Sequence, residues 1–174
     1  MTANRWRSLG AAAARAVPEG LATTHQPVPS QDGRVALAFH SIASRLRTLL
    51  DQSDLADVDA VVAIARGGVV GGALAAYHLQ LPMHVVQIRY RDDANVPLEA
   101  APTVLGGGPD VRASHVLVVD DVCVSGATLR AACEALGPVA STTLVLKGRP
   151  GAADLVVFDD VTSCVRWPWG LEPD

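Results

Sequence analysis

A run of four apolar residues followed by two acids constrains this chain more than any other stretch. Val116 to Val119 are consecutively apolar, whereas a strand with one face in water alternates apolar with polar residues. The run predicts a parallel-sheet strand that is covered on both faces and ends at Asp120 and Asp121. Sheets of this kind bind ligands beyond the carboxyl ends of their strands, where carboxylates can hold sugar hydroxyls or a hard cation such as Mg²⁺.

The residues after the acids predict a phosphate site. Ser125 and Thr128 carry hydroxyl groups, and Gly126 between them allows a close approach of the backbone. A helix that begins near Thr128 would add the N–H groups of its first turn, which attract anions. A plainer interpretation stays open, in which the acids are turn residues and a hydroxyl group only caps the helix.

Helical and strand patterns alternate along the chain from Val35 onward. Strands are expected at about 59–65, 84–89, 115–120, 141–147 and 154–158. Helices are expected at about 35–51, from a glycine-rich turn to Leu79, and at about 128–136, where Gly137-Pro138 follows. The order predicts an α/β fold with a doubly wound, mainly parallel sheet.

The length of 174 residues and the 49% share of hydrophobic residues suit one domain whose sheet is buried on both sides. We expect this domain to span 31–174. Residues 1–30 form an extension that is rich in alanine and broken by prolines. Its arginines and its lack of an acid before Glu19 resemble a transit peptide, although alanine-rich starts are also common without targeting.

Charge and cysteine content narrow the function to small-molecule chemistry. A net charge of −4 with 4% aromatic residues offers no surface for a nucleic-acid backbone, so no nucleic-acid partner is expected. No apolar run reaches the ~18 residues of a membrane span, so no membrane association is expected. Three separated cysteines form neither a disulfide framework nor a zinc pattern, which favours a reducing cytoplasm.

The motif around the acids resembles the signature with which type I phosphoribosyltransferases bind phosphoribosyl pyrophosphate (PRPP). The shared pattern is an apolar strand, Asp120-Asp121, three residues, Ser125-Gly126, any residue, and Thr128. A second motif, Ala65-Arg66-Gly67-Gly68, resembles the pyrophosphate loop of the xanthine-guanine branch of this family. The dinucleotide and P-loop patterns do not fit this turn, because Val69 stands where a glycine is needed and no P-loop lysine follows.

The resemblance, which spans roughly 35–170, implies the type I phosphoribosyltransferase fold with a short C-terminal hood over about 154–174. It implies transfer of 5-phosphoribosyl from PRPP to a nucleobase, first of all guanine, xanthine or hypoxanthine, with release of diphosphate. It also implies Mg²⁺ as cofactor, a homo-oligomer, and a cis peptide bond before Arg66. Asp120 and Asp121 would be the catalytic and metal-holding residues, and PRPP would contact Arg66, Gly67, Arg89, Arg91, Val124, Ser125, Gly126, Ala127 and Thr128.

Lys147 and the C-terminal segment resemble the base-binding parts of the same branch. By that resemblance Lys147 reaches the exocyclic oxygen of a 6-oxopurine, and Val165 and Arg166 belong to a hood that covers the base. Other interpretations stay open: Lys147 could end a strand in solvent, and Trp167 and Trp169 could simply pack the chain end against the core.

The connection over about 91–113, rich in proline and glycine, corresponds to a loop that closes over PRPP in this family. Arg89 and Arg91 stand at its root, where one would bind diphosphate unless both are ordinary surface residues.

Two positions depart from the 6-oxopurine pattern. Val124 replaces an Asp that handles a proton near the attacking nitrogen, although adenine and orotate members of the superfamily also lack that Asp. Gly170 replaces an acid after Pro-Trp that helps to hold a second metal, and only Glu172 and Asp174 lie nearby. Two further hypotheses therefore stay open: a non-catalytic protein that senses PRPP or a nucleotide, and a transferase for a different acceptor.

Overall fold

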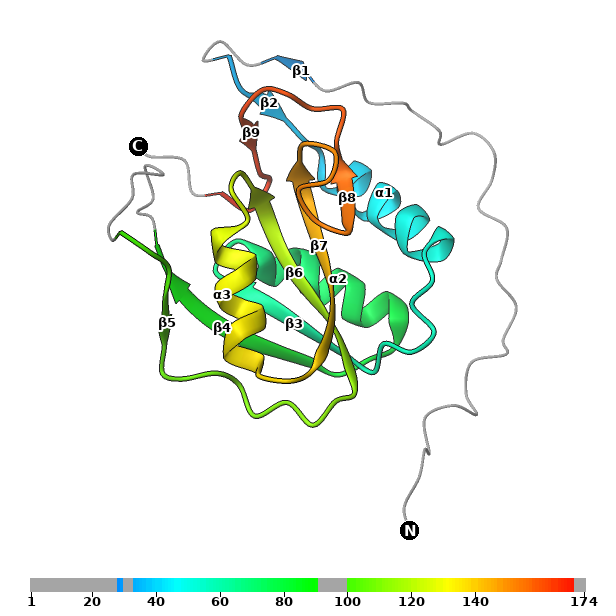
Figure 1. The fold of residues 1–174 in the computed structure, drawn as a ribbon. Helices are drawn as coiled ribbons and strands as arrows, with labels where there is room; N and C mark the ends of the chain where they lie inside the picture. The colour runs from blue at the N-terminus through cyan, green and yellow to red at the C-terminus, as the bar shows by residue number, and fades with distance from the viewer. Residues whose placement is uncertain (1–27, 30–32, 91–99, 171–174) are drawn as a thin grey trace, which may run out of the picture.

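A six-stranded sheet carries the fold in the computed structural model, which describes residues 28–29, 33–90 and 100–170 (Figure 1). The strand order is β5-β4-β3-β6-β7-β8, and all neighbours pair in parallel except β5, which is antiparallel to β4. The predicted α/β class with a mainly parallel sheet is confirmed. The strands are β3 (Ala60–Ala65), β4 (Met83–Arg89), β5 (Thr103–Leu105), β6 (His115–Cys123), β7 (Ala140–Gly148) and β8 (Leu155–Phe158).

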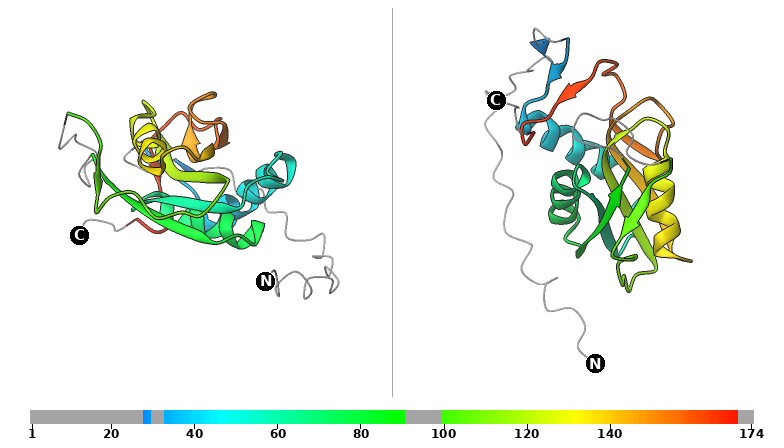
Figure 2. Two further views of the ribbon diagram at one scale, coloured as in Figure 1. Left: turned by 60° about the horizontal axis from the view of Figure 1, so that its bottom comes forward. Right: turned by 90° about the vertical axis from the view of Figure 1, so that its left-hand side faces the viewer.

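Helices cover both faces of this sheet, with α2 (Gly68–Leu79) and α3 (Ala127–Leu136) on opposite sides (Figure 2). The third helix, α1 (Phe39–Gln52), packs beside α2 and β8. Val116 to Val119 are fully buried, as predicted. Leu117 and Val119 belong to the core under α1 and α2, whereas Val116 and Val118 belong to the core under α3. In the parts of the chain that the structure describes, no helix has the length and apolar character needed to cross a membrane.

The helix expected at about 35–51 is confirmed as α1, but it begins at Phe39 and not near Val35. Val35–Ala36 form β2, which pairs in parallel with β9 (Val165–Arg166) and antiparallel with β1 (Val28–Pro29) in a second small sheet. The N–H of Val35 donates to the carbonyl of Cys164 at 2.8 Å. Helical spacing of apolar residues could not reveal this strand, because its partner comes from the opposite end of the chain.

The central strand β6 is longer than expected and runs through Asp120 and Asp121 to Cys123. Pairing with β7 sets the end of β6. This pairing continues past Asp120, with Val122 opposite Lys147 and Cys123 opposite Gly148. The acids therefore lie within a strand, held by its hydrogen bonds, rather than in the turn that follows.

The connection over 91–113 was expected to be irregular throughout, but Thr103–Leu105 form β5 at the edge of the sheet. This strand pairs with the last residues of β4, with Leu105 opposite Gln87 and Thr103 opposite Arg89. Residues 91–99, and with them Arg91, lie outside the described residues. Of the expected extension over 1–30, the structure describes only Val28–Pro29.

Candidate active site

Two strand-to-helix turns lie side by side at the carboxyl ends of β3 and β6, which are neighbours in the sheet. The first turn, between β3 and α2, contains Arg66 and Gly67, and the peptide bond between Ala65 and Arg66 is cis, as predicted. The second turn, between β6 and α3, consists of 124–126. The fold therefore brings the two sequence motifs to one edge of the sheet.

The two motifs are also in direct contact, because the start of α2 presses against β6. A Cβ atom on Gly67 would meet the carboxylate of Asp121. A Cβ atom on Gly68 would overlap the carbonyl oxygen of Val119 and lie 2.8 Å from the Cα of Asp120. Only glycine permits this approach at either position. The glycine pair and the acid pair thus form one continuous site.

Asp120 is buried, Asp121 is half-buried, and both carboxylates are bound to neighbouring backbone N–H groups. Asp120 is 7% exposed, and its Oδ1 accepts the N–H of Asp121 at 2.9 Å. Asp121 in turn accepts the N–H of Val122 on its Oδ1 at 2.7 Å. These bonds fix the direction of both carboxylates at the edge of the sheet.

Burial raises the pKa of Asp120 well above its ordinary range, and repulsion from the neighbouring Asp121 raises it further. Burial also raises the pKa of Asp121, although the N–H of Val122 opposes this rise. Both effects disfavour two negative charges at this place. A cation or a set of hydroxyl donors would stabilise the ionised pair, which is the chemistry that a metal-bound sugar phosphate provides.

The second turn has the geometry of an anion-binding loop. Gly126 adopts a left-handed conformation with φ of +74°, and α3 begins at the next residue. The first backbone bond into α3 runs from the N–H of Arg130 to the carbonyl of Gly126 at 2.9 Å, so the earlier N–H groups of the first turn have no partner within the helix. The Oγ of Ser125 accepts the N–H of Ala127 at 3.4 Å. Val124, at the head of the turn, is 68% exposed.

Lys147 lies on β7 directly beside Val122, so it is on the strand next to the acids and half-buried. Arg89 is the exposed last residue of β4, on the far side of β3 from the acids. Arg89 therefore ends β4 and Lys147 is the second-last residue of β7, so both lie near the carboxyl edge of the sheet, as expected.

The other predicted base-binding residues, Val165 and Arg166, form β9 of the small sheet. Val165, Trp167 and Trp169 pack against the core under α1 and α2. The two indole rings stack with centroids 5.2 Å apart, and Phe39 of α1 meets Trp169 edge-on at 6.4 Å. The tryptophans thus hold the end of the chain against the start of α1. Glu172 and Asp174 lie outside the described residues.

Sequence reasoning missed one cation at the second turn. Arg130, in the first turn of α3, donates from its Nη1 to the carbonyl oxygen of Ser125 at 3.0 Å. The signal was present in the sequence, because an arginine four residues after a turn glycine lies one helical turn above it.

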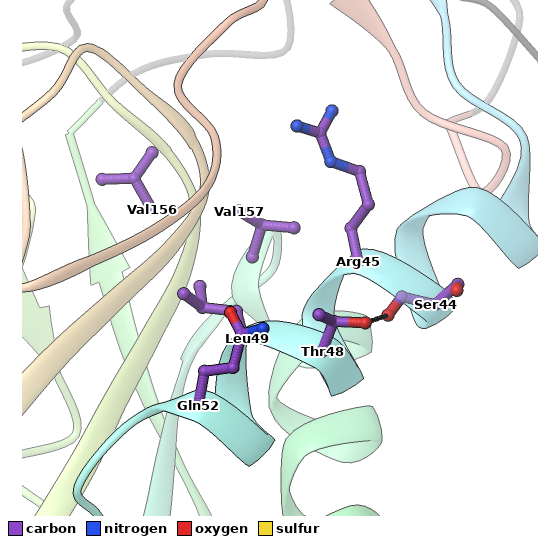
Figure 3. A pocket seen from close by; sticks show the side chains of 7 residues that line it. All are labelled: Ser44, Arg45, Thr48, Leu49, Gln52, Val156 and Val157. Atoms are coloured by element: carbon purple, nitrogen blue, oxygen red, sulfur yellow. Dashed lines mark hydrogen bonds between the residues drawn. The ribbon is translucent and has the colours of Figure 1, made fainter.

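A groove elsewhere on the molecule does not belong to this site. It has a volume of about 220 Å³ and lies between α1 and β8, as Figure 3 shows. It is lined by Ser44, Arg45, Thr48, Leu49, Gln52, Val156 and Val157. Over the described ranges, no three His, Cys, Asp or Glu side chains gather into a metal-binding group.

Comparison with known proteins agrees with this arrangement. Residues 37–174 match the family described as "Phosphoribosyl transferase domain". An adenine phosphoribosyltransferase from Saccharopolyspora erythraea is 35% identical over 52% of this chain and 56% of its own length. One from Nitrosococcus oceani is 30% identical over 67% of this chain and 68% of its own length. The chain thus spans little more than half of the first relative.

Solved structures share the fold. A purine phosphoribosyltransferase from Pyrococcus horikoshii superposes with a TM-score of 0.64 at 20% identity, covering 81% of this chain and 97% of that one. A xanthine-guanine-hypoxanthine phosphoribosyltransferase from Helicobacter pylori gives a TM-score of 0.62 at 18% identity, covering 77% of this chain and 90% of that one. With a family match over most of its length and a site built from the two turns of that fold, this chain belongs to the phosphoribosyl transferase domain family.

Proposed function

We propose that the protein transfers 5-phosphoribosyl from PRPP to a purine base and releases diphosphate. The observation that carries this proposal is the contact between the Gly67–Gly68 turn and the Asp120–Asp121 pair. A diphosphate-binding turn and a ribose-binding acid pair must be adjacent for one PRPP molecule to engage both. A protein that only senses a mononucleotide would have no use for the first turn.

Each part of PRPP has a candidate partner. Asp120 and Asp121 hold the ribose hydroxyls, Arg66 and Gly67 hold the diphosphate, and residues 124–128 hold the 5′-phosphate. Arg89, with Arg91, is the candidate to neutralise the diphosphate from the neighbouring strand. The acid pair also fits Mg²⁺. Burial raises the pKa values of these two adjacent carboxylates, and a cation would stabilise their ionised forms. When bound, Mg²⁺ would supply positive charge that helps the diphosphate to leave.

In the reaction, a ring nitrogen of the base forms a bond to the anomeric carbon of the ribose while the bond from that carbon to the diphosphate breaks. The electron pair of the broken bond leaves with the diphosphate, and the proton of the attacking ring nitrogen passes to solvent. The protein contributes position, charge neutralisation and exclusion of water, without a covalent intermediate on a side chain. Replacing both acids by Asn is expected to abolish turnover, and near-normal activity in that double variant would contradict this assignment.

For the acceptor we propose a 6-oxopurine, that is guanine, xanthine or hypoxanthine. Lys147 supports this choice, because it lies beside the acid strand where its ammonium group can donate to an exocyclic oxygen. Adenine is the second candidate, favoured by the exposed Val124 at the place of a proton-handling acid and by the names of the two curated relatives.

A turnover assay with PRPP, Mg²⁺ and guanine, xanthine, hypoxanthine, adenine, uracil or orotate separates these candidates by the mass of the nucleotide formed. Lys147→Ala should abolish use of oxopurines and leave PRPP affinity unchanged, whereas Arg47→Ala on the exposed face of α1 should change neither. If PRPP protects the fold against heat but no nucleotide forms, the protein is a PRPP-binding regulator or a transferase for another acceptor. Light scattering tests the homo-oligomer that we also propose.

A further inference from the structure

Arg130 touches the turn that the proposed function assigns to the 5′-phosphate, but it does so through the backbone. Its Nη1 donates to the carbonyl oxygen of Ser125 at 3.0 Å, and the same nitrogen lies 3.0 Å from the point where a Cβ on Gly126 would stand. The guanidinium group therefore lies against the peptide that links these two residues. A Cβ on Gly126 would be in tight contact with it, which a small shift of the arginine side chain would relieve.

This peptide controls how the turn presents its donors. Gly126 has φ of +74°, and the helix that follows starts within one residue. The direction of the first N–H groups of α3 depends on that single left-handed residue. An arginine that holds the carbonyl of Ser125 limits rotation of the peptide, and so it keeps these N–H groups aimed at one place.

Within the described part of the chain, no acidic partner neutralises the positive charge of Arg130, because no carboxylate pairs with it.

The guanidinium group of Arg130 places a positive charge at the root of the turn, because its Nη1 bonds the carbonyl oxygen of Ser125. A phosphate dianion bound there would gain attraction from this charge, in addition to the hydrogen bonds of the turn itself.

We propose that Arg130 is a positioning residue of the 5′-phosphate turn, which it holds through the carbonyl of Ser125, and that its positive charge adds affinity for the phosphate dianion. The inference rests on the proposed function, because it takes the second turn as the site of that phosphate.

Calorimetric titration with two partial ligands tests this inference. Ribose 5-phosphate carries only the phosphate that would bind to the second turn, whereas inorganic diphosphate would bind only to the first turn. Arg130→Gln is expected to weaken binding of ribose 5-phosphate about tenfold, the loss of one charge-assisted contact, and to leave diphosphate affinity unchanged. Arg47→Gln, an exposed arginine on α1, is the control and should change neither affinity.

Measurements at different ionic strengths distinguish an effect of the Arg130 charge from a purely structural role of its side chain. Wild-type affinity for ribose 5-phosphate should decrease as the salt concentration is raised from about 50 to 300 mM. The affinity of the Arg130→Gln variant should decrease less steeply, because salt screens a charge that the variant lacks. Arg130→Lys should recover part of the affinity and the wild-type salt dependence. Equal affinity for ribose 5-phosphate in wild type and Arg130→Gln overturns this inference alone. If the wild type binds neither partial ligand nor PRPP, the proposed function and the inference both fail.

Discussion

Asp120 shows at the level of one residue how a proposed site residue opposes stability. The side chain is almost fully buried and lies beside a second carboxylate, so its ionised form is disfavoured in the fold. An acid whose folded pKa is raised stabilises a protein fully below its unfolded pKa, here near 3.8, and that stability is lost as pH rises through the folded value. At neutral pH the carboxylate of Asp120 therefore destabilises the ligand-free protein. A bound cation and substrate can offset this destabilisation.

Asp120→Asn is consequently expected to make the ligand-free protein more stable, by about 1 to 3 kcal/mol at neutral pH, while turnover falls by about 10² or more. The amide oxygen can still accept the N–H of Asp121, so the local geometry is kept. Thermal unfolding in the presence of a chelator, followed from pH 5 to pH 8 in about half-unit steps, should show a gain that grows with pH.

The matched control for this substitution is Asp57→Asn at an exposed position, which should alter neither stability nor activity. A lower melting temperature for Asp120→Asn at every pH would mean that the charge of Asp120 is already compensated in the folded protein.

Most residues of the candidate site, but not all of them, could be predicted from the sequence. Strand, acids, turn glycine and hydroxyls follow one another in the chain, so a local pattern could identify them. The contact of Arg130 with Ser125 is also local, yet it was missed because an arginine on a helix is usually solvated. The closeness of Gly67 to Asp121 needed the sheet order, which no local pattern contains.

At the level of elements, helix α2 depends on small residues where it crosses the sheet. A Cβ on Gly68 would meet backbone atoms of Val119 and Asp120, which cannot move without breaking β6. A Cβ on Gly71 would meet only the side-chain end of Leu146, at 3.2 to 3.3 Å. The two glycines belong to the same helix and differ in what lies opposite them.

Gly68→Ala should therefore cost about 1 to 3 kcal/mol of unfolding free energy, or more, because the helix must move away from the strand. Gly71→Ala should be within about 1 kcal/mol of wild type, since Leu146 can shift and alanine favours a helix over glycine by a similar amount. Urea denaturation of both variants measures the difference. Equal losses would show that the start of α2 is not seated on β6 as described.

The elements that the sequence failed to predict are those whose partners lie far along the chain. Val35–Ala36 form a strand only because Val165–Arg166 lie next to them. β5 exists only as an edge partner of β4. By contrast, β6 and α3 were predicted closely, because burial on both faces and helical capping leave marks within a single segment. The three-residue extension of β6 beyond the expected end again depends on its neighbour β7.

In the molecule as a whole, the small sheet and an aromatic cluster join the two ends of the described chain. Phe39 begins α1, and Trp169 lies close to the end of the described residues, with the two rings edge-on at 6.4 Å. A double-mutant cycle with Phe39→Ala and Trp169→Ala should give a coupling of about 0.5 to 1.5 kcal/mol in unfolding free energy. Purely additive losses would mean that the two ends are held by the small sheet alone.

Ligand binding should stabilise the whole fold, because the site draws on β3, α2, β6 and α3 together and cannot exist in the unfolded chain. A ligand at about 100 times its dissociation constant adds about 2.7 kcal/mol, which raises the melting temperature of a domain of this size by about 5 to 10 °C. PRPP with Mg²⁺ should produce this shift. Removing the cation with a chelator should abolish most of it, because the buried acid pair would then face the negatively charged substrate without compensation. The variant with Asn at both Asp120 and Asp121 should melt at the same temperature with and without Mg²⁺ and PRPP. A full shift in that variant would mean that the ligand binds elsewhere on the molecule.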